Sequence, residues 1–132
     1  MAIKLSVAVK NGRLNAIETA IGVSAVLKIR TGAAPTAITD ADTGTVLATL
    51  TLPSDWLAAA SAGAISMTGS WADASADAAG TAGHFRIYAS DGTTQHMQGS
   101  VAASAADMIV DNVVFAAAQA FSITSFTLTD GN

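Results

Sequence analysis

The sequence predicts an all-β protein: an antiparallel, jelly-roll-like β-sandwich of about seven strands with a short N-terminal helix. From residue 23 onward, apolar and polar residues alternate with a period of two, as they do in strands that bury one face. No helical stretch separates these segments, which favours antiparallel pairing. A length of 132 residues suits one domain, so we expect an arm and helix at residues 1–22 and a sandwich at residues 23–132.

The first element is predicted to be a helix. Its stripe recurs at helical spacing and consists of Val7, Lys10, Leu14, Ile17 and Ile21. Ser6 suits the N-cap, and Gly22 suits a left-handed end. Gly12 leaves an alternative, because glycine inside a helix costs about 1 kcal/mol relative to alanine. An extended arm would then precede a helix of residues 13–21.

The predicted strands follow the alternating stretches and lie at residues 25–30, 46–52, 65–71, 84–88, 95–101, 108–115 and 121–129. In the last stretch, Phe121 and Ile123 share one face whereas Phe126 and Leu128 share the other. A β-bulge near Ser125 would restore a single buried face. Alternatively, the strand passes from one packed surface to another, such as a subunit interface. Residues 55–60 are expected to form a short helical turn that buries a tryptophan.

Charge is scarce and unevenly distributed. Only 12% of the residues are charged, about half the usual share. Five of the six basic residues precede Thr31, and the body that follows is acidic. This layout is either chance or a basic docking surface for an acidic partner. The acidic body argues against nucleic-acid binding. The N-terminus lacks an apolar stretch long enough for a signal peptide or a membrane span, so we expect a soluble protein that starts near Met1.

Catalytic residue types are few: one Glu, two His, one Tyr and no Cys. A three-residue hairpin loop at residues 90–92 would place Phe85 opposite Met97 inside the protein and Arg86 opposite His96 outside. A two-residue loop would instead put His96 on the inner face. The preferred register predicts an exposed face made of His84, Arg86, Tyr88, His96 and Gln98. This face lacks a nucleophile and an orienting carboxylate, so we interpret it as an interface or a solvated strand face.

No cofactor or metal is predicted. The segment from Asp40 through Asp42 to Gly44 resembles the opening of a calcium loop but lacks the third oxygen ligand and the distal Glu. A capped turn is the better interpretation. Two histidines alone do not make a zinc site.

Two segments carry a resemblance: residues 13–22, which run into residues 24–32, and residues 44–56. Together with the ending at residues 121–132, they resemble small proteins encoded among the structural genes of tailed bacteriophages. The resemblance covers most of the chain and rests on packing and turn residues. It implies a virion component, assembled in the host cytoplasm, of the kind loosely called decoration, cement or tail proteins.

The leading functional hypothesis is therefore a non-enzymatic capsid cement or decoration protein. Its expected partners are copies of itself and the major capsid protein, with no nucleic acid and no membrane. The alternative is a tail- or fibre-associated module that binds a receptor glycan through Trp56, Trp71 and Tyr88. The basic N-terminal side chains Lys4, Lys10 and Arg13 are predicted to join the interface.

Overall fold

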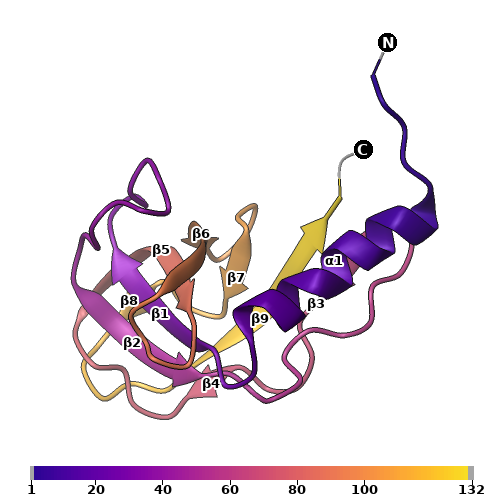
Figure 1. Cartoon of the computed structure of the whole chain (residues 1–132). Coiled ribbons are helices and arrows are strands. Elements are labelled where there is room, and N and C mark those ends of the chain that lie inside the picture. Colours follow the sequence, from indigo (N-terminus) through magenta and orange to yellow (C-terminus); the bar gives the residue numbers. More distant parts are fainter. Residues whose placement is uncertain (1, 131–132) are drawn as a thin grey trace.

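The computed structural model describes residues 2–130, which form one helix and nine strands (Figure 1). The expectation of a mostly β chain with one short N-terminal helix is confirmed. The elements are α1 (Val7–Ile21), β1 (Val26–Thr31), β2 (Val46–Thr51), β3 (Ala64–Ser66), β4 (Ala72–Asp73), β5 (Gly80–Tyr88), β6 (Gln95–Ala102), β7 (Met108–Val110), β8 (Val114–Phe115) and β9 (Phe121–Thr129).

Helix α1 begins and ends where the sequence predicts. The Ser6 hydroxyl accepts a hydrogen bond from the Val9 amide at 3.3 Å. Gly22 has a positive φ of 97°, and its amide donates to the Glu18 carbonyl at 2.8 Å. The helix runs through Gly12 without interruption, so the alternative of an extended arm up to that glycine is wrong.

The strands form one curled sheet in the order β2-β1-β5-β6-β7-β9-β3, with β4 beside β9 and β8 beside β5 (Figure 1). The prediction of purely antiparallel pairing is wrong at β6 and β7, which run parallel. They share only the pairs Val101–Met108 and Ala102–Ile109. The connection between them is far shorter than the dozen or more residues of a regular parallel crossover, so the pairing stays short. The two-sheet, jelly-roll-like arrangement remains a prediction.

The hairpin of β5 and β6 differs from the predicted register by two residues. Ile87 pairs with Met97, and Arg86 pairs with Gln98 rather than with His96. The Ala89 amide donates to the Thr94 carbonyl, which closes a longer loop than expected. His96 is skipped by the pairing as a bulge residue. A slip of two preserves which side chains share a face, so Gln98 stays on the Arg86 face and Met97 on the Ile87 face, as predicted, whereas the bulge takes His96 out of this alternation.

Strand β9 contains the expected bulge. Its register with β7 shifts between the Ile109–Ser125 pair and the Val110–Ile123 pair, so Thr124 is the extra residue. The shift lets Phe121, Ile123 and Phe126 all be buried, as the sequence pattern requires.

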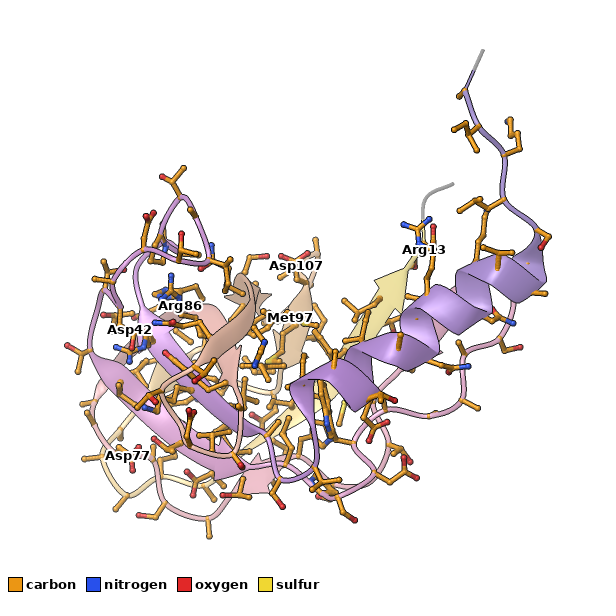
Figure 2. All side chains as sticks on the ribbon, viewed as in Figure 1. Arg13, Asp42, Asp77, Arg86, Met97 and Asp107 are labelled. Carbon is orange, nitrogen blue, oxygen red and sulfur yellow. The ribbon has the colours of Figure 1, made fainter. Side chains whose placement is uncertain are left out.

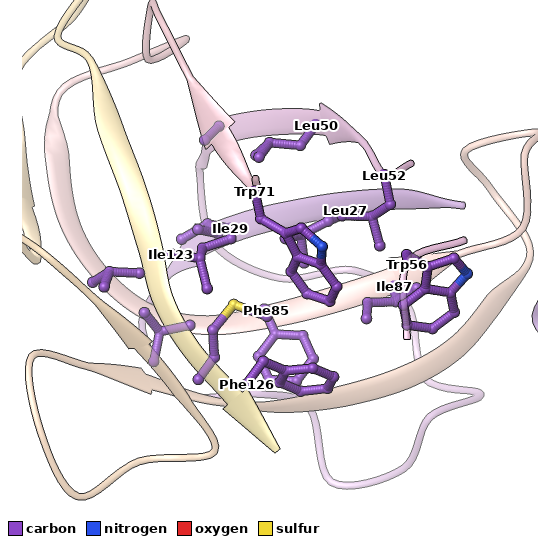
Figure 3. Packing of buried hydrophobic residues seen from close by; sticks show 14 of the residues in the cluster. Leu27, Ile29, Leu50, Leu52, Trp56, Trp71, Phe85, Ile87, Ile123 and Phe126 are labelled. Carbon is purple, nitrogen blue, oxygen red and sulfur yellow. The ribbon is translucent and has the colours of Figure 1, made fainter. Parts of the chain in front are cut away.

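A continuous apolar core fills the curl of the sheet (Figure 3). Aromatic rings in contact form its centre. The ring centroid of Trp71 lies 6.0 Å from that of Trp56 and 5.4 Å from that of Phe126. Phe126 meets Phe85 edge to face at 5.6 Å. Ile87, on the same strand as Phe85, is fully buried. The domain therefore has one core of its own.

The predicted helical turn at residues 55–60 is wrong, although Trp56 is fully buried as expected. This segment contains no helix, Leu57 forms an isolated β-bridge with Met67, and polar side chains of α1 accept hydrogen bonds from its backbone amides. The Trp56 amide donates to Glu18 Oε1 and the Ala60 amide to Asn15 Oδ1, each at 2.8 Å. Because the helix satisfies these amides, the segment needs no helical hydrogen bonds of its own.

Candidate interaction surface

The face of β5 that the sequence predicts to be exposed is buried within the monomer. His84, Arg86 and Tyr88 are each fully buried, so the prediction that they project into solvent is wrong. The segment between β1 and β2, residues 32–45, supplies the acceptors that these side chains use. The residues share one strand face, as predicted, but the connecting segment covers it.

Arg86 is the centre of this buried polar layer (Figure 2). Its Nη1 donates to Asp42 Oδ1 at 2.8 Å and to the Asp40 carbonyl at 2.9 Å, and its Nη2 donates to the Ala37 carbonyl at 3.3 Å. Its Nε donates to Gln98 Oε1 at 3.0 Å. The guanidinium thus binds the connecting segment to the sheet, and we call this set of contacts the arginine clamp.

Asp42 joins this clamp to a second arginine. Its Oδ2 accepts from Arg30 Nη2, and its Oδ1 also accepts from the Tyr88 hydroxyl, each at 2.8 Å. Burial raises the pKa of Asp42, but hydrogen bonds from Tyr88 and Arg86 and the arginine charges outweigh it, so the pKa lies below its ordinary value. Burial and the bond to Asp42 raise the pKa of Tyr88.

Asp40 caps a turn, and the Asp42 carboxylate is held by side-chain donors. Asp40 Oδ2 accepts from the Ala37 amide at 2.8 Å, and both oxygens of Asp42 face arginine donors. Within residues 2–130, no group of three or more acidic or histidine side chains could hold a metal. Turn capping therefore explains Asp40, and the ion pairs with Arg30 and Arg86 explain Asp42.

The other three residues of the predicted face, His84, Gln98 and His96, have different surroundings. The His84 ring lies with Nδ1 2.8 Å from the Gly32 carbonyl, and its buried Nε2 contacts no polar partner in the described part of the chain. The side-chain Nε2 of Gln98 donates a hydrogen bond to the Pro35 carbonyl at 2.7 Å. His96 alone is exposed, at the bulge. Most of the predicted patch therefore stabilises the fold.

The exposed surface that stands out lies at the N-terminus. Five large apolar side chains are exposed among residues 2–130, and three of them, Ile3, Val7 and Val9, lie in the arm or the first turn of α1. Ile3 is 78% exposed. Residues 2–6 have no regular structure, and the arm points away from the sheet (Figure 1). An apolar arm of this kind is typical of a surface that another molecule covers.

The predicted basic residues of the N-terminus have different settings. Lys4 is exposed on the arm, and Lys10 is half-buried on α1. Arg13 Nε lies 3.2 Å from Asp130 Oδ2, next to the end of β9. The charge of Arg13 is therefore already matched inside the monomer, whereas the prediction of a docking role for Lys4 and Lys10 stays open.

A groove of about 450 Å³ lies between α1 and the sheet. Its apolar lining comes from Leu14 and Ile17 on the helix, Met97 on β6 and Leu128 on β9. The Arg13–Asp130 ion pair borders it. Sequence reasoning missed this groove, because its walls come from three distant segments. The one signal in the sequence was that Leu128 lies on the opposite strand face from Phe121 and Ile123 in a regular alternation.

Comparison with known proteins finds no relative: no protein-family model, curated protein or solved structure matches the chain. Among residues 2–130, the single helix is too short and too polar to cross a membrane. The exposed arm and the groove are therefore the features from which a function is inferred.

Proposed function

We propose that this chain is a non-enzymatic structural subunit of a bacteriophage particle, a capsid cement or decoration protein that docks through its N-terminal arm. The observation that supports this most is the exposed apolar arm with Ile3 at its tip and Val7 and Val9 behind it. Covering such side chains removes about 25 cal/mol of unfavourable free energy per Å² of apolar surface.

The charge layout supports an acidic docking partner. Lys4 and Lys10 lie beside the exposed apolar residues, and the remainder of the chain carries nearly all of its acidic residues. Charges at the rim of an interface mainly raise the association rate and make binding sensitive to salt. An acidic shell, or the acidic body of a neighbouring copy, would complement them. The proposal includes a jelly-roll-like packing of the curled sheet.

The alternative of a glycan-binding tail module has less support. Trp56, Trp71 and Tyr88, which would have formed its aromatic platforms, are all fully buried in the monomer. A glycan needs an exposed ring face to stack on. A tail location without glycan binding is an outcome that the experiment below distinguishes.

Copy number in the particle tests the proposal. Particles of the phage that encodes the chain are purified, and the chain is quantified by mass spectrometry against the major capsid protein and a tail-tube protein. A ratio to the capsid protein near that of a regular lattice position supports a shell role. A ratio that matches a minor tail component contradicts decoration, and absence from the particles contradicts the proposal as a whole.

A further inference from the structure

We propose that the N-terminal arm of one copy, residues 2–5, inserts as an extra β-strand into the groove between β6 and β9 of a second copy. This inference rests on the proposed assembly role and names the contact that would produce it. It follows from the pairing of the sheet, the lining of the groove and the pattern of the arm.

The sheet has room for a strand at this place. β7 lies between β6 and β9 in the sheet order, but it is only three residues long. Its first residue, Met108, pairs with Val101 on one side and Phe126 on the other. Beyond Met108 the two neighbouring strands continue. Residues 95 and 97–99 of β6 pair only with β5, and residues 127–129 of β9 pair only with β3.

Both pairings place the missing strand in the groove. Continuing β7 backwards would set it between residues 97–100 of β6 and residues 127–129 of β9. The groove is lined by Met97 of β6, by Leu128 and Thr129 of β9, and by Asp130, which follows β9. Leu14 of α1 lines the same space. Within residues 2–130, the facing edges at residues 97–99 of β6 and 127–129 of β9 have no strand between them, and the floor of the groove is apolar, the arrangement used in β-strand addition.

The chain's own loop does not fill this position. Asp107, which precedes β7, turns back to β6, where its Oδ2 accepts from the Ser100 amide and hydroxyl at 2.8 Å. These bonds lower the pKa of Asp107. The Asp107 carboxylate thus occupies the backbone amide of β6 at Ser100. The edge of β6 at residues 97–99 stays accessible to another strand.

The arm has the pattern that this position requires. Ile3 and Leu5 are two residues apart, so an extended arm presents both to one face and Lys4 to the other. Four residues match the short length of the open edges. Since the arm points away from its own sheet, a second copy is the natural acceptor (Figure 1).

Cysteine cross-linking tests the contact directly, because the chain has no cysteine of its own. The Ile3→Cys protein, labelled with ¹⁵N, is mixed with unlabelled Leu128→Cys protein and oxidised. We expect a disulfide-linked dimer of mixed isotope mass. The matched control pairs Ile3→Cys with Thr51→Cys, an exposed position on β2 at the far edge of the sheet. Equal yields with Leu128→Cys and Thr51→Cys, or no mixed dimer with Leu128→Cys, would overturn the proposal.

Solution association provides the second arm of the test. Light scattering during size-exclusion chromatography should show wild-type oligomers, and Ile3→Asp should weaken association roughly ten- to a hundredfold. Val23→Asp is the control, since Val23 is an exposed valine outside the groove. A wild type that stays monomeric at all concentrations, or equal effects of the two changes, refutes arm insertion. Neither result depends on finding the chain in particles, so this contact and the proposed function can fail separately.

Discussion

Replacing Asp42 with Asn tests whether the buried arginine clamp holds the fold together. The carboxylate accepts from Arg30, Arg86 and Tyr88, each at 2.8 Å. An asparagine keeps the shape but removes the charge, and its NH₂ group has no lone pair to offer an arginine. Arg86, fully buried, would then lack its only side-chain counter-charge among the described residues.

The expected loss follows from this geometry. Removing one partner of a buried ion pair costs about 3–5 kcal/mol. Asp42 is 31% exposed, and Arg86 keeps Gln98 and two carbonyls as acceptors, so we expect the low end, about 3 kcal/mol. Urea unfolding followed by circular dichroism measures it as a lower midpoint at unchanged slope.

Asp77→Asn is the matched control for charge. Asp77 is exposed and accepts one bond from the Thr49 hydroxyl, so its loss should cost less than about 1 kcal/mol. Equal destabilisation by the two changes would refute the clamp. Since the pKa of Asp42 is lowered by folding, its contribution is present above the unfolded pKa of about 3.9 and fades as the pH falls through the folded value. The difference in the free energy of unfolding between wild type and Asp42→Asn should therefore become smaller below about pH 4.

Three further outcomes are expected. Ile87→Ala should destabilise the domain by about 2–5 kcal/mol in urea, whereas Val114→Ala, at an exposed position, should stay within about 0.5 kcal/mol; equal effects would contradict the core assignment. Gly44→Ala should cost more stability than Gly32→Ala, because both glycines have positive φ but only a Cβ at residue 44 would collide with the Thr31 carbonyl; equal costs would show that the close approach is unimportant. A chelator should leave the melting temperature unchanged, and a drop of many degrees would point to a metal bound by the acidic segment.

The fold was predictable where local pattern decides it. Helix α1 carries both of its end signals in Ser6 and Gly22, and the period-two alternation identifies the faces of β1, β5 and β9. The β9 bulge was readable because Phe126 falls out of phase with Ile123. Each of these features depends on residues close together in the chain.

The buried polar layer could not be predicted in the same way. Alternation shows that Arg86 and Phe85 lie on opposite faces, but it does not show that residues 32–45 cover the polar one. That depends on Asp42 meeting Arg86 across 44 positions of sequence. The parallel pairing of β6 and β7 and the groove beside it likewise arise from long-range contacts.

Imaging the assembled particle tests the central proposal most directly. A reconstruction by electron cryomicroscopy should show the domain on the outside of the head, with residues 2–5 of each copy lying against a neighbouring molecule. Changing Lys4 and Lys10 to Glu should lower the occupancy of the domain on particles at low salt, and the difference from wild type should shrink at high salt, where the charges are screened. Density for the domain at the tail alone, or on the head with a free arm, would contradict the proposed mode of assembly.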